Sequence, residues 1–420
     1  MHVDIHQHLW PGVLIDELRR RTEPPRLDGW TLLTSGEPPF EVNPADHDVR
    51  RRAAQAARDG IGLAVIGPSN PLGIEYLAPE DAEPLLDAYH RGVAGLGRPF
   101  AGWATACLAA IDAPSLAKQL DRGFAGLQLP ATALADESGY RWCGPLLDVL
   151  AERDLPLFIH PGPAGATAPE AGLGVAGRGV AGVGAAGVTT GRAGAAGAMV
   201  PGAAPSVTAV GAAGVMAGRA AGPGMAGVGA AGVTTGQAAA RGMAGVGAAG
   251  AVAGRASAAG AVAPGAAGAS AAGMTTTVAG AGGPAWWAAL VPYVQQLHAA
   301  WFAFRAYGRP AYPRLRVCFA ALAGLGPLHG ERMAARGGTD PLARGVIDSR
   351  TFVETSSYGS RAVDSVLRVL GVDTLVFGSD RPYARPNPDL GLGEAARHAI
   401  RVTNPARLLQ GDRPSPEPGI

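Results

Sequence analysis

The residues in this chain that could do metal chemistry stand at the ends of short apolar segments. Residues 3–8 read as a strand that ends in a His-x-His pair, His6 and His8. Because side chains alternate between the two faces of a strand, both imidazoles would project from one face and could share a metal ion. Two later apolar runs end in His160 and in Asp380. Three imidazoles and one carboxylate form a ligand set that suits a divalent cation such as zinc.

The opening His-x-His, the later His160 and the closing Gly378-Ser379-Asp380-Arg381-Pro382 occur in an order that resembles the amidohydrolase superfamily. The resemblance is nearest to the amidohydrolase-related branch that includes aminocarboxymuconate-semialdehyde decarboxylase. It covers about 300 residues on the two sides of a long insert. It implies that His6, His8, His160 and Asp380 surround one divalent metal ion, for which we expect zinc.

One ligand of this family is missing from the chain. Residues 315–324 resemble the family's sixth strand, but Ala321 stands where the family has a histidine, and alanine cannot bind a metal ion. His329, eight positions further on, and His298, on the preceding helical segment, are the candidates to replace that ligand. Some lactonases of the same superfamily work without a metal, so a metal-free site is an open alternative.

The resemblance implies a catalytic role for Asp380 and His160. A divalent metal lowers the pKa of its bound water from about 15.7 towards 7, and Asp380 would take the water's proton and return it to the leaving group. This predicts a metal-dependent hydrolase of a small polar or carboxylate substrate. Two alternatives stay open: a non-oxidative decarboxylase of an aromatic or unsaturated acid, and a metal-free lactonase or inactive barrel that serves as a binding protein.

Four further residues are candidates for contacting the substrate, namely Trp10, Gln128, His329 and Arg381. Arg381 is the best candidate to bind a carboxylate, because a guanidinium can donate two parallel hydrogen bonds to it. A salt bridge at the rim is an equally good interpretation for Arg381, and packing is the more common role of a tryptophan such as Trp10. We expect Glu331 and Arg332 to form an ion pair. Four other histidines match no pattern and are expected at the surface: His2, His47, His90 and His398.

Eight strand candidates alternate with helical patterns along the chain. They cover residues 3–8, 63–67, 100–106, 123–129, 155–160, 316–322, 351–355 and 374–379. This alternation predicts an α/β fold with a parallel sheet, and eight units predict a closed (β/α)8 TIM barrel whose strand ends gather the site at one mouth. Residues 11–45 contain Pro24-Pro25 and Pro38-Pro39, so we expect one long irregular loop over that mouth.

A long Gly/Ala-rich, low-complexity insertion follows the fifth strand candidate. Residues 171–284 contain no aromatic residue, Lys, Asp or Glu, so they offer little surface to bury. We expect residues 1–163 and 284–412 to form one barrel domain, with disorder in the insert (164–283) and the tail (413–420). The repeated AGVGAAGVTTG contains a formal G-x-G-x-x-G, but no strand or acidic residue accompanies it, which argues against nucleotide binding.

Charge and cysteine content narrow the partners and the compartment. The formal net charge of +1 suggests neither a nucleic-acid nor a membrane partner, which leaves a small-molecule substrate. Three widely spaced cysteines argue against a disulfide framework and favour a cytoplasmic protein. Because dimers are common in the family that the chain resembles, a homodimer is possible.

Overall fold

A computed structural model of the chain describes residues 1–164, 284, 286–386 and 390–411. The contacts divide the chain into two units, and every described residue belongs to the unit formed by Met1–Ala176 and Gly273–Ile420. Residues 165–283 and 413–420, for which the sequence predicts disorder, lie outside the described residues.

Eight parallel strands close into a ring. One sheet has the order β1-β5-β6, and a second runs from β7 through β8, β9 and β10 to β11. At one seam the amide of Ala104 donates to Gly126 O at 2.8 Å, and at the other the amide of Ile5 donates to Phe377 O at 3.0 Å. The predicted barrel is therefore present. Its strands are β1 (His2–His8), β5 (Ile61–Gly67), β6 (Phe100–Gly102), β7 (Leu127–Pro130), β8 (Leu157–His160), β9 (Val317–Phe319), β10 (Thr351–Glu354) and β11 (Leu375–Val376).

The strands are apolar along nearly their whole length because both faces are covered. Inside the ring, the Phe158 side chain stacks on Trp103 with ring centroids 5.3 Å apart. The same Phe158 ring also contacts the imidazole of His6, with centroids 5.1 Å apart. Outside it, helices pack against the strands, as expected for a parallel sheet. Because the ring interior and the helix-covered outer face are both apolar, polar side chains gather at the ends of the strands.

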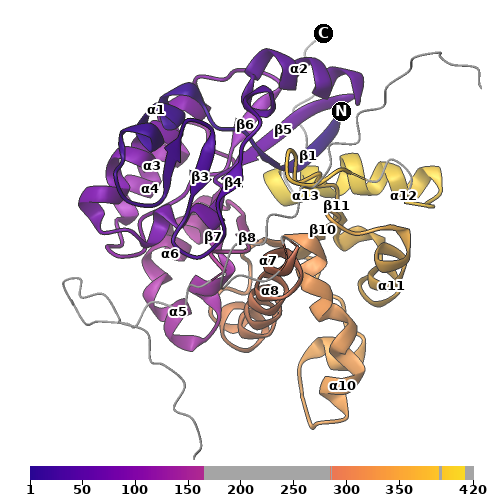
Figure 1. Cartoon of the computed structure of the whole chain (residues 1–420). Coiled ribbons are helices and arrows are strands. Elements are labelled where there is room, and N and C mark those ends of the chain that lie inside the picture. Colours follow the sequence, from indigo (N-terminus) through magenta and orange to yellow (C-terminus); the bar gives the residue numbers. More distant parts are fainter. Residues whose placement is uncertain (165–283, 285, 387–389, 412–420) are drawn as a thin grey trace, which may run out of the picture. The chain divides into compact units, whose positions relative to one another are not determined.

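Helices lie around the strands, those of the first half on one flank and those of the last third on the other (Figure 1). Several begin at an aspartate whose side chain accepts an amide hydrogen bond, as Asp48 does for α2 and Asp112 for α4. The helices are α1 (Gly12–Arg20), α2 (Val49–Arg58), α3 (Pro79–Ala94), α4 (Ala113–Asp121), α5 (Glu137–Trp142), α6 (Gly144–Arg153), α7 (Trp287–Leu290), α8 (Pro292–Ala303), α9 (Arg309–Ala311), α10 (Gly330–Ala334), α11 (Ser360–Leu370), α12 (Glu394–His398) and α13 (Asn404–Gln410).

The first long connection is more regular than the sequence predicts. It contains helix α1, followed by an antiparallel sheet of β2 (Arg26–Asp28), β3 (Thr31–Leu33) and β4 (Phe40–Glu41). The prediction of one irregular loop is wrong because the proline pairs stand between these elements and interrupt none of them.

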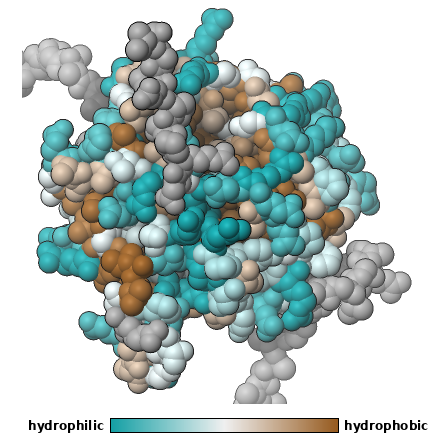
Figure 2. Space-filling model, turned by 180° about the vertical axis from the view of Figure 1, so that it is seen from behind, coloured by the Kyte–Doolittle hydropathy of each residue, from teal (hydrophilic) through white to brown (hydrophobic). Residues whose placement is uncertain are grey.

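The face of the molecule shown in Figure 2 is neither uniformly hydrophobic nor uniformly hydrophilic. On the face turned away from the viewer in Figure 1, hydrophilic and hydrophobic residues alternate in small patches (Figure 2). Within the part of the chain that the structure describes, no helix has the length and apolar character needed to cross a membrane. Cys107, Cys143 and Cys318 are all free, which confirms the prediction that they form no disulfide framework.

Candidate metal centre

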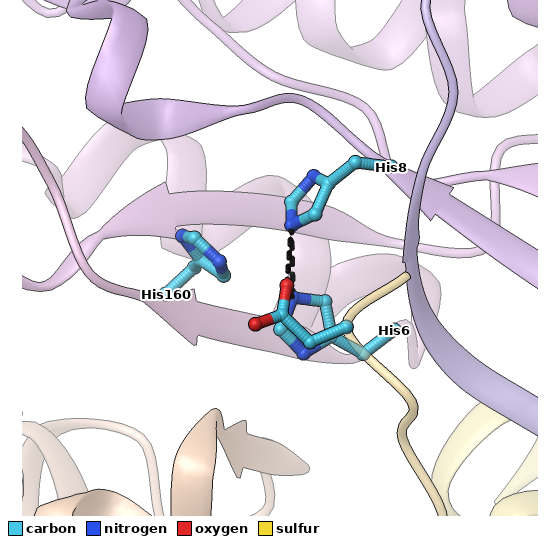
Figure 3. A group of neighbouring side chains, drawn as sticks. His6, His8 and His160 are labelled. Atoms are coloured by element: carbon cyan, nitrogen blue, oxygen red, sulfur yellow. Dashed lines mark hydrogen bonds and ion pairs between the residues drawn. The ribbon is translucent and has the colours of Figure 1, made fainter. Parts of the chain in front are cut away.

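His6, His8, His160 and Asp380 come together at one end of the ring. One potential ligand atom from each lies within 4.8 Å of the others. The Nε2 atoms of His6 and His8 are 3.1 Å apart, and Asp380 Oδ1 lies 3.2 Å from Nε2 of His8 and 3.5 Å from that of His6. Figure 3 shows the three imidazoles converging on one point, with a dashed line from His8 to the carboxylate. The predicted convergence of these four residues is confirmed.

Strand geometry explains how residues so far apart in the chain meet. In β1, His6 and His8 point into the site, while the intervening Gln7 points away and donates to Asp4 Oδ2 at 2.7 Å. Asp380 follows β11 with a φ of 54°, a left-handed conformation that aspartate tolerates better than most residues. Its amide donates to His6 O at 2.8 Å, which ties the end of the last strand to the first.

Each of the three imidazoles has its Nδ1 beside an oxygen acceptor. Nδ1 of His6 lies 3.0 Å from a carboxylate oxygen of Glu354, that of His8 lies 3.2 Å from Gly67 O, and that of His160 lies 2.8 Å from Pro161 O. Because these oxygens can only accept, each Nδ1 carries the proton and each Nε2 presents a lone pair. Metal-binding histidines in proteins are oriented in this way.

The donor set fits a cation. Three Nε2 atoms and a carboxylate oxygen face one another, and a cation at the centre would offset the repulsion among their lone pairs. The site is shielded from water, since His6 and His8 are 1% exposed and His160 is 6% exposed. Burial, together with the two other imidazoles, sets the pKa of His160 well below its usual value. Burial alone would raise the pKa of Asp380, but the three imidazoles outweigh it and lower that pKa. These two directions favour a neutral His160 and an ionised Asp380, which are the forms that bind a metal. Burial alone would lower the pKa of His6, but the carboxylates of Asp380 and Glu354 outweigh it and raise that pKa, so His6 would give up a proton to a bound cation.

The sequence interpretation missed Glu354, which orients His6. Glu354 ends β10, is fully buried, and accepts hydrogen bonds at 2.6 Å from the amides of Ala321 and Ser356 and from the Ser356 hydroxyl. A bare carboxylate this deeply buried is stabilised by such a set of donors. The signal was an acidic residue at the carboxyl end of the seventh predicted strand, where side chains face the mouth.

No protein-family model and no curated protein matches the sequence. Solved structures match it over nearly its whole length. IDCase from Metarhizium anisopliae is 14% identical, with 98% of each chain covered and a TM-score of 0.58. A 5-carboxyvanillate decarboxylase from Novosphingobium aromaticivorans, with bound manganese, is 14% identical, with 97% of each chain covered and a TM-score of 0.55. An amidohydrolase II is 11% identical, covering 97% of this chain and 99% of that one, with a TM-score of 0.54. The chain has the amidohydrolase fold.

Within this amidohydrolase fold, the sixth barrel strand contributes no metal ligand. Ala321 follows β9 with a φ of 46° and instead donates its amide to Glu354. Neither proposed replacement joins the group of four. The rings of His298 and His329 contact each other edge to face at 5.3 Å, and His298 Nε2 is hydrogen-bonded to Gly324 O. His298 and His329 therefore contact each other, and His298 contacts the connection that follows β9.

Arg381 does not face the mouth. It pairs in register with Gln7, whose side chain points away from the site, and its guanidinium lies 2.8 Å from a carboxylate oxygen of Asp59. The salt-bridge interpretation of Arg381 is confirmed, and its contact with a substrate carboxylate stays a prediction that this geometry does not favour. The preceding residue, Asp380, has the left-handed φ of 54°, and this local turn sets the direction of Arg381.

Trp10 is a packing residue. Its indole is 2% exposed, stacks on the His47 ring with centroids 4.4 Å apart, and donates to Ser69 Oγ at 3.0 Å. These contacts fit the packing role, and contact of Trp10 with substrate stays a prediction that its burial does not favour. His47 itself accepts the Trp10 amide at 3.0 Å. Burial lowers the pKa of His47 to about 3, so the expectation of a surface histidine is wrong there.

Gln128 lies inside the ring without reaching the mouth. Its Nε2 donates to Pro68 O at 2.8 Å and to Asn70 Oδ1 at 2.6 Å, and the side chain is fully buried. A Cβ atom on Gly67 would collide with its amide oxygen, so glycine is required beside it. Because Gly67 O anchors His8, Gln128 supports a segment that orients a potential metal ligand, and its contact with substrate stays a prediction.

Two remaining expectations about polar residues are wrong. His90 is 4% exposed because its Nε2 accepts the amide of Thr105 at 3.2 Å. Among the described residues, Arg332 has no ion pair, so the expected pairing with Glu331 does not occur.

Aromatic side chains line the entrance. The Tyr383 ring lies 5.3 Å from the His8 ring and is 44% exposed. Phe40, from β4 of the first connection, lies 6.2 Å from the Tyr383 ring and is 49% exposed. The first connection therefore reaches the entrance, as the sequence predicts, and brings an aromatic ring to it.

Proposed function

We propose that this protein is a metal-dependent, non-oxidative decarboxylase of an aromatic or unsaturated carboxylic acid, within the amidohydrolase-related branch. The observation that carries the proposal is the buried centre of three Nε2 atoms and one carboxylate at the mouth of an amidohydrolase fold. The choice of decarboxylation over hydrolysis is supported by the matched structures, among them 5-carboxyvanillate and 2,6-dihydroxybenzoate decarboxylases. A hydrolase of a small carboxylate substrate is the second candidate, because the same centre could activate water.

His6, His8, His160 and Asp380 would hold the metal, with zinc and manganese as the candidate ions. When bound, a divalent ion acts as a Lewis acid that stabilises negative charge on a substrate oxygen. We assign proton transfer to Asp380, because 19% of its side chain is exposed whereas the three imidazoles are nearly sealed. As the bond to the departing carboxylate breaks, its electron pair would stay on carbon. Asp380, ionised at rest, would first take a proton from a water molecule at the mouth and then pass it to this carbon. His160 fixes the far side of the centre.

The entrance suits an aromatic ring. Tyr383 and Phe40 present exposed ring faces close to His8, and aromatic pairs in offset or edge-to-face contact add about 0.5–1.5 kcal/mol beyond area burial. We therefore propose a small-molecule substrate in which a carboxylate is attached to an aromatic or conjugated skeleton.

Product analysis tests the proposal. The purified protein is incubated with zinc or manganese and a panel of hydroxylated aromatic acids, and carbon dioxide and the ring product are quantified. We expect equimolar release of both, loss of activity after chelation, and recovery with added metal. Ester or lactone hydrolysis without carbon dioxide would favour the hydrolase. Failure to bind either ion would favour the metal-free lactonase or binding protein.

A further inference from the structure

A second pocket lies outside the metal centre, between α8 and α10. It is a largely open groove of about 380 Å³, and it is lined by His298, Phe302, His329, Arg332, Met333 and Arg336. None of these residues belongs to the metal centre. A volume of this size suits a small organic molecule, since ligand pockets commonly enclose about 300–1,000 Å³. Figure 1 places α10 at the periphery, beyond α8.

The charge of this pocket is one-sided. Two guanidiniums and two imidazoles line it, and no carboxylate does. Arg332 and Arg336 are exposed at the rim of the groove, whereas the less exposed Arg305 and Arg309 are paired with Asp340 and Asp348. In the described part of the chain, by contrast, neither Arg332 nor Arg336 has an ion pair. Two unpaired guanidiniums over one cavity attract an anion, and each can donate two parallel hydrogen bonds to a carboxylate.

The rest of the lining selects the remainder of the ligand. Phe302 lies one turn after His298 on α8, their rings are 6.5 Å apart, and the His329 ring lies 6.3 Å from Phe302. Met333 adds a flexible apolar side chain that adapts to irregular shapes. A flat apolar ligand group would contact these side chains while its anionic end meets the arginines.

A metal ion is a poorer fit than an anion. His298 Nε2 is already hydrogen-bonded to Gly324 O, so His298 has only Nδ1 to offer, and the pocket supplies no carboxylate to balance a cation. The two guanidiniums would repel one. The paired imidazoles therefore serve as one wall of an organic-anion pocket.

We propose that this pocket is a second binding site, for a small aromatic carboxylate. The site is independent of the proposed function, because its residues neither bind nor orient the metal ligands. Occupancy would stiffen the connection after β9, which also carries the Ala321 amide that hydrogen-bonds Glu354.

Binding of 4-fluorobenzoate to the intact protein, followed by fluorine NMR and calorimetry, tests the site. We expect the wild-type protein to bind one equivalent more than R332Q/R336Q, in which affinity at this site falls at least tenfold. The matched control R50Q/R51Q removes the same charge from exposed positions of α2 and should keep wild-type binding. The neutral 4-fluorobenzyl alcohol should bind at least tenfold more weakly.

Three outcomes would overturn the assignment: equal binding to R332Q/R336Q and to the control, equal binding of the neutral alcohol, or full displacement by inorganic phosphate at the same concentration. A further variant, Phe302→Ala, should weaken fluorobenzoate but not phosphate, which separates an aromatic-acid site from a simple anion site. Because turnover at the metal centre does not depend on these arginines, unchanged decarboxylation or hydrolysis in R332Q/R336Q is expected whichever activity the protein has.

Discussion

At the residue scale, the metal centre depends on oxygens that bind the far nitrogen of each imidazole. Glu354 is the one charged member of that set, and it also holds the amide of Ala321. The imidazole of His6, the amide of Ala321 and the hydroxyl of Ser356 all contact Oε1 of Glu354, while the Ser356 amide donates to Oε2. The absence of a sixth-strand ligand is thus accompanied by a backbone contact that keeps the His6 partner in place.

Asp380→Asn should abolish turnover while leaving the fold intact. The amide oxygen can still face the imidazoles, but it carries no charge and moves no proton. We expect kcat to fall by at least two orders of magnitude, in line with the loss of a general acid–base group. Circular dichroism should be unchanged. Retention of more than a tenth of the activity would remove Asp380 from its proposed role.

Glu354→Gln should weaken metal binding about 10–100-fold, the usual effect of losing a carboxylate behind a metal-binding histidine. The substitution keeps the volume but gives His6 a neutral partner. Chelator competition measures the affinity directly. Glu152→Gln, on the exposed end of α6, changes the same charge far from the centre and should have no effect. Equal affinities in the two variants would contradict the orienting role.

Glu75 gives the protein a pH dependence of its own. It is 1% exposed, and its Oε1 accepts from Thr105 at 3.0 Å, but burial still raises its pKa from 4.5 to about 7. The folded state therefore holds this proton more tightly than the unfolded chain does. Its stabilising effect is fully present below about pH 4.5 and is lost as pH rises to 7.

Replacing Glu75 with Gln removes this pH-dependent contribution to the free energy of unfolding. We expect the difference in unfolding free energy between E75Q and wild type to shift in favour of E75Q by roughly 2 kcal/mol from pH 5 to pH 8. Urea titrations at the two pH values measure it. A difference that stays constant across that range would mean that Glu75 does not titrate there.

At the element scale, the sequence predicts the barrel and the metal centre better than it predicts the substrate contacts. Strand alternation decides that His6 and His8 share a face, and it holds for any strand. The direction of the Arg381 side chain depends on the left-handed conformation of Asp380 before it, and no sequence pattern predicts that conformation. Trp10 and His47 are buried by each other, which is a tertiary contact between distant residues.

The first connection is held over the mouth by a contact with α8. The Tyr293 hydroxyl donates to Glu37, just before β4. Burial raises the pKa of Tyr293, and the charge of Glu37 and the hydrogen bond to it raise that pKa further. The contact therefore connects the segment carrying Phe40 to the opposite side of the mouth.

Tyr293→Phe should loosen this closure. A hydrogen bond to a carboxylate contributes about 1.5–3 kcal/mol, so we expect KM to rise about tenfold with kcat within twofold. Steady-state kinetics on the substrate identified by product analysis measures both. Tyr312→Phe, which removes a similar hydroxyl contact with Asp148 at 3.0 Å, lies outside the mouth and should leave KM unchanged. A KM that responds equally to both variants would exclude a closing role.

At the scale of the whole molecule, the described residues close the barrel without help from the insert. The ring is continuous from β1 through β11, and the insert falls between β8 and α7. The face shown in Figure 2 carries only small hydrophobic patches, and it identifies no dimer interface. The mass of the protein in solution would test the expected homodimer directly.

Replacing residues 165–283 with a flexible linker of about 15 residues tests whether the insert belongs to the enzyme or only interrupts it. Loop closure costs about 0.6 kcal/mol per doubling of length, and this change removes about three doublings. We expect the shortened protein to be more stable by up to about 2 kcal/mol, with kcat/KM within threefold of the full chain. Urea unfolding and steady-state kinetics provide the two measurements. A shortened chain that folds but is inactive would instead give the insert a part in catalysis, because the four ligand residues and Glu354 all lie outside it.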